Sequence, residues 1–296
     1  MKQPGDDTLI PPQQAGRRDP WVDIGLALEA YPPAAEVYAH LLRHTGELRE
    51  RRLADACFFI HKPPGIRWRL HSPRSSSTAD LRRAAASSAA RIVGAERVRC
   101  AVYEPQQALF GGPRSMGYVH RSWDADSQLW LGAHARSARP LPLSARVDLS
   151  FRVLSYVFGA LGVVGWEDRE VWEHVTVDTG RRLAEHEWRR PEVTALAARL
   201  AGSWAAVWPA VAQRRPAAGP PPDPLLREFA DSGGEALAGW YEECLSRPGT
   251  RHLLTPRRAA AYWTVFHWNR TGLPAAHQAL IAQTLAGPPP VRAEAM

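Results

Sequence analysis

Two short β-prone segments joined by a proline-rich turn constrain the fold of this chain more than any other feature. Residues 57–61 (CFFIH) and 66–71 (IRWRLH) both favour strands, and the Lys-Pro-Pro-Gly between them suits a turn. The period of two divides the second segment into an apolar and a basic face: Ile66, Trp68 and Leu70 against Arg67, Arg69 and His71. The pattern therefore predicts an antiparallel hairpin with a basic stripe over a core.

Helical spacing dominates the chain after this hairpin. Further strands are expected at residues 21–30 and 97–103. Amphipathic spacing with Pro or Gly near the ends predicts helices at residues 32–54, 79–93, 115–134, 148–161, 167–189, 192–211, 224–243, 256–270 and 274–286. We expect an α+β fold in which N-terminal antiparallel β-sheet elements pack with a larger, mainly helical C-terminal part.

One domain is expected to account for most of the chain. At 296 residues the chain is long enough for one large domain or two small ones. No internal repeat divides it, and we expect a single domain at residues 19–286 with a Pro-rich loop at 214–223 (RRPAAGPPPD). Residues 1–18 predict a flexible N-terminal tail and residues 287–296 a C-terminal tail.

Several classes of protein do not fit this composition. No apolar run approaches the roughly 20 residues that span a bilayer, and the first residues do not resemble a secretory signal. Cys57, Cys100 and Cys244 form no CxxC pair and leave one cysteine over, which predicts buried, reduced thiols in a cytoplasmic protein. We expect no disulfide framework, no metal site, no cofactor and no membrane partner.

The net charge of +7 and the pI near 9.8 would favour an acidic partner. Only two of the 37 basic residues are lysines, and the chain is rich in Ala and Pro, as translation of GC-rich DNA tends to give. We therefore expect a solvated basic surface with no specific nucleic-acid partner, although an acidic peptide segment remains compatible.

The segment YWTVFHWNRTG (262–272) concentrates polar side chains in an apolar stretch. Helical spacing gives it two neighbouring stripes: Trp263, His267 and Arg270 on one, and Tyr262, Phe266 and Asn269 on the other. This combination suggests a site. The alternative is that His267 is a hydrogen-bonded core histidine and Arg270 a cation that complements the helix dipole before Gly272.

For each of the other candidate residues, a purely structural role is an alternative to a functional one. Arg67 and Arg69 can clamp a carboxylate or a peptide backbone, or simply face solvent. Glu104 follows a strand end, where side chains often project into a cleft, but it can also be a surface carboxylate. The FGGP turn (110–113) can expose backbone amides or merely start a helix. The twelve tryptophans can line a groove for flat azole rings, or form the core.

Four segments in order carry a family resemblance: FFIHKPPGIRWRLH, then YEPQQALFGGPRSM followed by ADSQLW, then RVDLSFRVLSYVFGALG, and finally FHWNRTGL. Together they resemble the thiopeptide-type bacteriocin biosynthesis domain, which is similar to the C-terminal elimination domain of lantibiotic dehydratases. The likeness covers residues 19–285 and implies an enzyme that acts on a precursor peptide without a cofactor.

The resemblance implies one of two stand-alone activities. Glutamate-eliminating members typically have an arginine and a glutamate just after the tyrosine of the YEP region, and Arg-Tyr before Gly-Gly. This chain has Pro105 and Gln106 at the first place and Leu109 and Phe110 at the second. The departure favours a thiopeptide pyridine synthase, which joins two dehydroalanines by formal aza-cycloaddition and eliminates the leader peptide. Glutamate elimination and a non-catalytic leader-binding module remain the alternatives.

Residue roles follow from the same resemblance. His267 is expected to shuttle protons, because imidazole titrates near neutral pH; Tyr262 would donate to the reacting amide oxygen, and Glu104 would be a second proton-transfer group. Asn269 and Arg270 would orient the intermediate. The expected substrate- and leader-binding side chains are Arg67, Arg69, Trp68, Trp263, Trp268 and Tyr103. Other enzymes of the same pathway and a homodimer are compatible partners. Burial of His267 with no opening beside it would contradict the expected mechanism, in which a Trp-lined cleft folds the peptide back on itself while nearby side chains transfer protons.

Overall fold

The computed structural model describes residues 20–73, 78–137, 139–208, 223–246 and 254–287. The predicted tails and most of the predicted Pro-rich loop, residues 1–18, 288–296 and 214–222, lie outside the described residues. Asp223, the last residue of that predicted loop, instead caps a helix, since its side chain accepts a hydrogen bond of 2.8 Å from the backbone N–H of Leu225.

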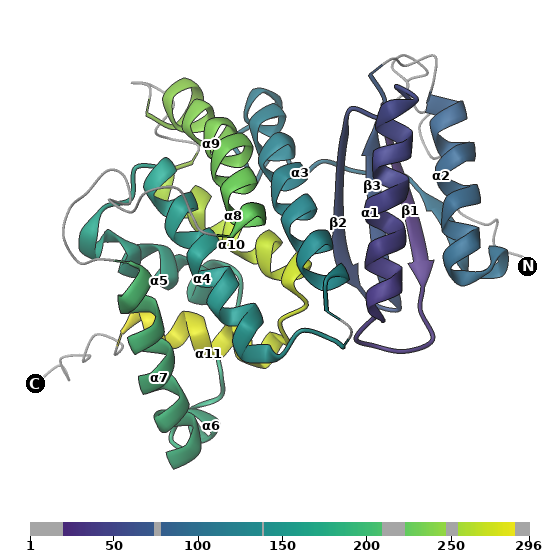
Figure 1. Cartoon of the computed structure of the whole chain (residues 1–296). Coiled ribbons are helices and arrows are strands. Elements are labelled where there is room, and N and C mark those ends of the chain that lie inside the picture. The colour runs from purple at the N-terminus through teal and green to yellow at the C-terminus, as the bar shows by residue number, and fades with distance from the viewer. Residues whose placement is uncertain (1–19, 74–77, 138, 209–222, 247–253, 288–296) are drawn as a thin grey trace, which may run out of the picture.

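A four-stranded antiparallel sheet forms the N-terminal part, as predicted. Its strands are β1 (Trp21–Ala27), β2 (Ala56–Lys62), β3 (Gly65–His71) and β4 (Val98–Ala101), in the spatial order β2-β3-β1-β4. The predicted hairpin is β2–β3, and β1 lies on the other side of β3 (Figure 1). In this register Arg69 lies opposite Asp23 on one side and Phe58 on the other.

The two faces of the sheet have different neighbours, in agreement with the predicted alternation. Helices α1 (Ala35–Glu50) and α2 (Thr78–Val93) pack on the apolar face (Figure 1). There the fully buried Trp68 donates its indole N–H to Thr45 Oγ1 at 3.3 Å and to Cys57 Sγ at 3.0 Å. The opposite face carries the predicted basic stripe of Arg67, Arg69 and His71.

Helices make up the rest of the described chain, which confirms the α+β class. They are α3 (Pro113–Ala135), α4 (Leu143–Ala160), α5 (Asp168–Asp178), α6 (Glu185–Trp188), α7 (Pro191–Val207), α8 (Pro224–Glu228), α9 (Gly234–Trp240), α10 (Pro256–Thr271) and α11 (Ala275–Ala286), with π-helical turns at Phe229–Gly233 and Tyr241–Leu245. The single helix expected at 167–189 is wrong, because Gly180 takes a φ of 67° and the helix ends at Asp178.

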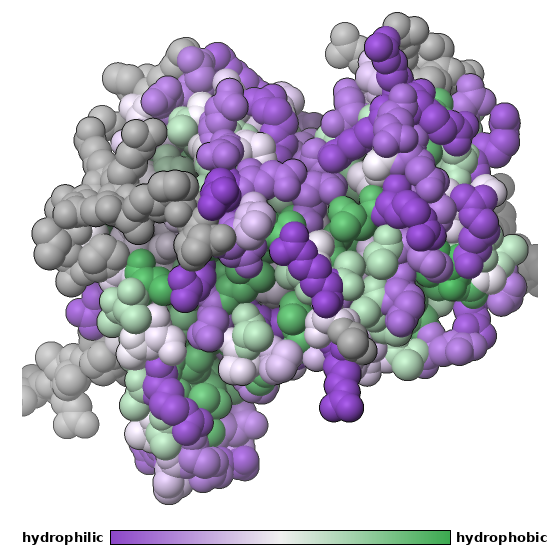
Figure 2. Space-filling model, in the orientation of Figure 1, coloured by the Kyte–Doolittle hydropathy of each residue, from purple (hydrophilic) through white to green (hydrophobic). Residues whose placement is uncertain are grey.

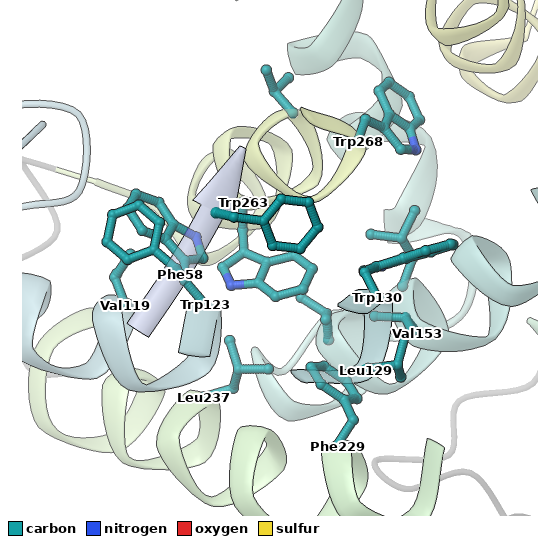
Figure 3. Close-up of a cluster of buried hydrophobic side chains, with 14 of the residues drawn as sticks. Phe58, Val119, Trp123, Leu129, Trp130, Val153, Phe229, Leu237, Trp263 and Trp268 are labelled. Carbon is teal, nitrogen blue, oxygen red and sulfur yellow. The ribbon is translucent and has the colours of Figure 1, made fainter. Parts of the chain in front are cut away.

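Helix α10 runs through the interior of the helical part and reaches β2 at its C-terminal end (Figure 1). The Thr255 side chain caps its start by accepting from the Arg258 N–H, and Gly272 ends it in the left-handed conformation at φ 69°. Trp263 lies at the centre of a cluster between Trp123 and Trp130 (Figure 3). The segment that predicted a site is therefore the core helix of the molecule.

The surface seen in Figure 2 has mainly hydrophilic residues over α1 and α2, while hydrophobic residues gather where the sheet meets the helical part. Among the described residues no single helix has both the length and the apolar composition to cross a membrane; α4 with residues 165–178 would qualify only as a pair bent by 112°. Cys57 is buried, but Cys100 is exposed, so the prediction of a buried thiol is wrong there.

Candidate functional site

A buried polar network joins α10 to α3 and α4; we call its members, Asp126, Ser150, His267 and Arg270, the Asp126 network. Both carboxylate oxygens of Asp126 accept from His267 Nδ1, at 2.9 and 3.1 Å, and one also accepts from Arg270 Nε at 2.5 Å. On the other side of the ring, Ser150 Oγ lies 2.9 Å from His267 Nε2. Because the carboxylate can only accept, Nδ1 donates its proton to Asp126, and Ser150 is the partner of the second ring nitrogen.

Charge balance explains how this network tolerates burial. Burial alone would raise the pKa of the Asp126 carboxyl, but His267 and Arg270 beside it hold that pKa below its ordinary value. Among the described residues, the two terminal nitrogens of Arg270 have no hydrogen-bond partner, yet the guanidinium lies 5.5 Å from the Trp123 ring and 5.8 Å from the Trp263 ring. Cation–π contacts at these distances stabilise a desolvated guanidinium.

The burial of His267 and Arg270 contradicts the expectation that they face a substrate groove. Each has 0% of its surface exposed, and both ring nitrogens of His267 are bonded within the protein. His267 is thus the hydrogen-bonded core histidine that the sequence left as the alternative. Trp68, Trp263 and Trp268 are equally buried, so these three tryptophans pack in the core and do not form groove walls.

The outer stripe of α10, namely Tyr262, Phe266 and Asn269, is only half-buried. Phe110, from the predicted FGGP turn, packs edge-on to Phe266 at 5.4 Å and to Tyr262 at 6.3 Å between ring centroids. The FGGP segment therefore serves as a packing element beside the outer stripe as well as a start for α3. Tyr262 and Asn269 are the two predicted catalytic residues of α10 that solvent reaches.

On the sheet, the basic stripe divides into an inner and an outer arginine. Arg69 donates to the buried Asp23 at 3.0 Å, and its guanidinium lies 4.7 Å from the ring of Tyr103. Its side chain is 13% exposed, whereas that of Arg67 is 32% exposed and lies 3.6 Å from the other Asp23 oxygen. Arg67 is therefore the member of the predicted clamp that is accessible to a peptide.

The YEP segment lies beside this stripe. Tyr103 is buried and its hydroxyl forms a hydrogen bond of 2.8 Å with His120 Nε2, while Glu104 is exposed. Burial, together with the nearby His71 and Arg69, lowers the pKa of His120 to about 3, which keeps this ring neutral at pH 7. His120 is a functional candidate that the sequence analysis did not single out.

Aromatic rings connect the sheet face to the outer stripe of α10 without a break. We call this row the aromatic seam; its members are Trp21, Tyr103, Phe58, Trp123, Phe110 and Phe266, with successive centroids 5.2–5.6 Å apart. Glu104 follows Tyr103 in the chain, and Tyr262 packs against Phe110, so these two accessible predicted residues flank the seam, whose rings other than Phe266 are buried. We take the surface along the seam as the candidate site.

A groove lies elsewhere in the molecule. A groove of about 710 Å³ runs between α3, the α8–α9 segment and the end of α1, and none of the predicted site residues is among its described lining residues. Its wall carries Glu228, Glu235 and Glu242, while Arg49 pairs with Asp124 at its base. Within the described ranges, no group of three or more His, Cys, Asp or Glu is arranged to hold a metal ion.

Two acidic residues that organise the site were missed, although the sequence gives a signal for each. Asp126 is the carboxylate of α3 that shares a helical face with Trp123 and Trp130, which Asp124 does not. Asp23 interrupts the apolar strand β1 and is only 3% exposed. A single acid in an apolar run indicates a buried cation as its partner, but which arginine it meets depends on sheet register and helix packing.

Comparisons with known proteins place these features in a family. The sequence model for the lantibiotic biosynthesis dehydratase C-terminal family matches residues 26–287. No curated protein matches the chain. Among solved structures, the tRNA-dependent lantibiotic dehydratase MibB from Microbispora sp. 107891 shares the fold, with a TM-score of 0.58 at 16% identity over 93% of this chain. The match spans 28% of the MibB chain. This chain belongs to the lantibiotic biosynthesis dehydratase C-terminal family.

Proposed function

We propose that this chain is a thiopeptide pyridine synthase: it joins two dehydroalanines of an azole-containing precursor peptide and eliminates the leader peptide. Membership of the dehydratase C-terminal family supports a dehydratase-like role in making modified ribosomal peptides. The choice between cyclisation and glutamate elimination depends on residues 104–110, the segment beside the aromatic seam.

The observation that carries the proposal is the absence of a cation between Tyr103 and Gly111. Residues 104–110 read EPQQALF, with no Lys, Arg or His. Phe110, where an eliminating member would present a tyrosine, is fully buried against Trp123 and Phe266. Expelling glutamate requires a group that stabilises its carboxylate and delivers a proton, and this segment supplies only Glu104 and neutral side chains.

Cyclisation makes fewer demands on charged groups. Its main barrier is the entropy of bringing two distant alkenes together, and correct orientation can supply about 7–11 kcal/mol in favourable intramolecular cases. The adduct then loses water, and the leader departs as a carboxamide when the ring becomes aromatic. Proton transfer by a positioned side chain typically adds about 10²–10⁴ in rate.

The structure supports particular residues for these steps. Glu104 and Tyr262 are the accessible proton-transfer groups that flank the seam, and Asn269 offers a half-exposed amide on the outer stripe. Arg67 would grip the leader at the sheet. The Asp126 network would act indirectly, by fixing the rotation of α10 and hence the direction of Tyr262 and Asn269.

Mass spectrometry of one reaction tests the function. The purified chain is incubated with a dehydrated, azole-bearing precursor and, separately, with a glutamylated peptide. A macrocycle together with free leader carboxamide is the expected result. Loss of glutamate from the glutamylated peptide would establish elimination instead. Binding without any mass change would leave only a leader-binding module.

Peptide capture is tested separately by fluorescence anisotropy of a labelled leader. Arg67→Ala is expected to weaken leader binding roughly tenfold, because a charge-assisted hydrogen bond contributes about 1.5–3 kcal/mol. Arg83→Ala, on the solvent side of α2 with 80% of its side chain exposed, is the matched control. Equal affinities for the two variants would remove Arg67 from the binding surface.

A further inference from the structure

The groove between α3 and the α8–α9 segment, which packs beside α3 (Figure 1), has three carboxylates along one wall; we call it the acidic groove. Its volume of about 710 Å³ is within the range of about 300–1,000 Å³ that is usual for ligand sites. Glu228, Glu235 and Glu242 line this wall and are exposed. Within the described ranges, none of the three carboxylates has an ion-pair or hydrogen-bond partner.

These three glutamates account for the whole charge excess of the acidic groove. At its base Asp124 pairs with Arg49, and Arg121 on α3 is the second cation of the lining. With Asp55, the described lining has five carboxylates and two guanidinium groups, so two positive charges against five negative ones leave a net charge of −3. The chain as a whole has a net charge of +7. The acidic groove is therefore a negative site on a basic protein, which favours a cationic occupant.

The spacing of the glutamates indicates what kind of cationic occupant fits. They recur every seven residues, and a helix that rises 1.5 Å per residue places successive carboxylates about 10 Å apart. A peptide in the polyproline II conformation has three residues per turn and rises about 3.1 Å per residue, so every third side chain lies on the same face, about 9 Å further along. Such a peptide needs no backbone hydrogen bonds from the walls.

We propose that the acidic groove binds a basic segment of a partner protein in the polyproline II conformation, with arginine or lysine at every third residue. Each cation pairs with one of the three glutamates, and the residues between them face the apolar part of the lining, which includes Ala125, Leu129 and Leu225. A nucleic acid or an acidic leader peptide would be repelled by the net negative charge. The proposal does not depend on the function proposed above, because none of the predicted site residues lines this groove.

Fluorescence anisotropy with the full chain and synthetic peptides tests the proposal. The probe is a labelled peptide of nine residues with arginine at positions 2, 5 and 8 and proline elsewhere; the comparison peptide has the same composition with its three arginines adjacent. We expect the probe to bind saturably, more weakly as salt is raised, and at least about fivefold more tightly than the comparison peptide. Absence of binding, or equal affinity for the two peptides, would overturn the proposal.

Charge variants show whether the acidic groove is the place of binding. Changing its three glutamates together to glutamine should weaken probe binding about tenfold or more, because each exposed ion pair contributes a factor of roughly 1.5–5. The control removes the same charge from three exposed positions outside the groove, by combining Glu36→Gln, Glu173→Gln and Glu192→Gln, and should leave the affinity nearly unchanged. An equal loss in both triple variants would mean that the probe responds only to net charge, which would overturn the proposal.

A steric variant tests occupancy of the acidic groove without a change of charge. Ser232 is exposed and lies on the wall between Glu228 and Glu235, so Ser232→Trp places a large ring in the path of the peptide. We expect the affinity for the probe to fall at least about fivefold, with a circular dichroism spectrum that matches the parent protein. An unchanged affinity would place the peptide outside the groove. If this variant does not fold, the charge variants decide the proposal by themselves.

Discussion

The two stripes of α10 look alike in sequence and differ completely in the structure. The inner stripe, Trp263, His267 and Arg270, has no exposed surface, and His267 and Arg270 both hydrogen-bond Asp126. The outer stripe, defined above, is half-buried and borders the aromatic seam. The comparison teaches that the most reactive side chains of the motif hold the helix in place, while its less conspicuous neighbours are the ones a peptide can touch.

Removing the carboxylate at the centre of the inner stripe should have the largest effect. Asp126→Ala leaves Arg270 buried without a counter-charge and His267 without its acceptor, so we expect a loss of about 3–5 kcal/mol in the free energy of unfolding. Urea unfolding followed by tryptophan fluorescence measures it. Asp231→Ala, at an exposed position, is the control and should change stability by less than about 0.5 kcal/mol. A loss below about 1 kcal/mol for Asp126→Ala would mean that the network is not structural.

Acidification should reduce the free energy of unfolding through the buried histidines that surround α10, and it should affect the outer stripe less. Burial lowers the pKa of His61 and His120 to about 3 and that of His134 to about 4, against about 6.5 in an unfolded chain. Below pH 6.5 the unfolded state therefore binds more protons, so stability is complete above that pH and falls toward pH 4, by up to about 1.4 kcal/mol per pH unit for each ring. Urea midpoints at pH 7.5, 6.5 and 5.5 measure the slope, and a midpoint that stays constant would refute it.

Ser150→Ala is a gentler change to the inner stripe. It leaves His267 Nε2 buried without a partner, which costs about 1–3 kcal/mol, while Asp126 still holds the other side of the ring. We expect lower stability with the macrocycle yield per folded molecule preserved, as a positioning role requires. A variant that is fully stable but inactive would instead give the His267 imidazole a direct part in proton transfer.

The outer stripe should show the smallest effect on stability and a clear effect on chemistry. Tyr262→Phe and Asn269→Ala change half-exposed groups, so unfolding free energies should stay within about 0.5 kcal/mol of the parent. Macrocycle formation should slow by about tenfold or more, since a positioned proton donor contributes about 10²–10⁴. Rates of cyclisation under single-turnover conditions decide this, and unchanged rates in both variants would exclude the outer stripe from the reaction.

Local patterns predicted the elements well. The β2–β3 hairpin follows from its alternation and its Pro-Pro-Gly turn, and α10 follows from Pro256 at its start and Gly272 at its end. The sequence also assigned the two stripes of α10 correctly, because helical spacing fixes which residues share a face. It could not say which stripe turns inward, since both are aromatic and polar. That depends on Asp126, a residue 141 positions away from His267 that reaches it only through packing of α3.

The candidate site could be predicted only in part, because it too depends on long-range packing. Arg67 and Arg69 have identical character in the sequence, yet Arg69 bonds Asp23 closely and is 13% exposed, whereas Arg67 is 32% exposed. Long-range register of this kind has no signature in the residues nearby. The sequence also does not show which polar side chains are buried, because a hydrogen-bonded core histidine and a catalytic histidine look the same in it.

The hydrogen bond from His61 to the Asn269 carbonyl has a consequence for substrate choice. It joins the edge strand β2 to the end of α10, so the distance between Arg67 and the outer stripe is fixed. A peptide bound at both places would have to bridge a fixed distance between them. Precursors whose reactive residues lie too near the leader, or too far from it, would then be rejected by length before any chemistry begins.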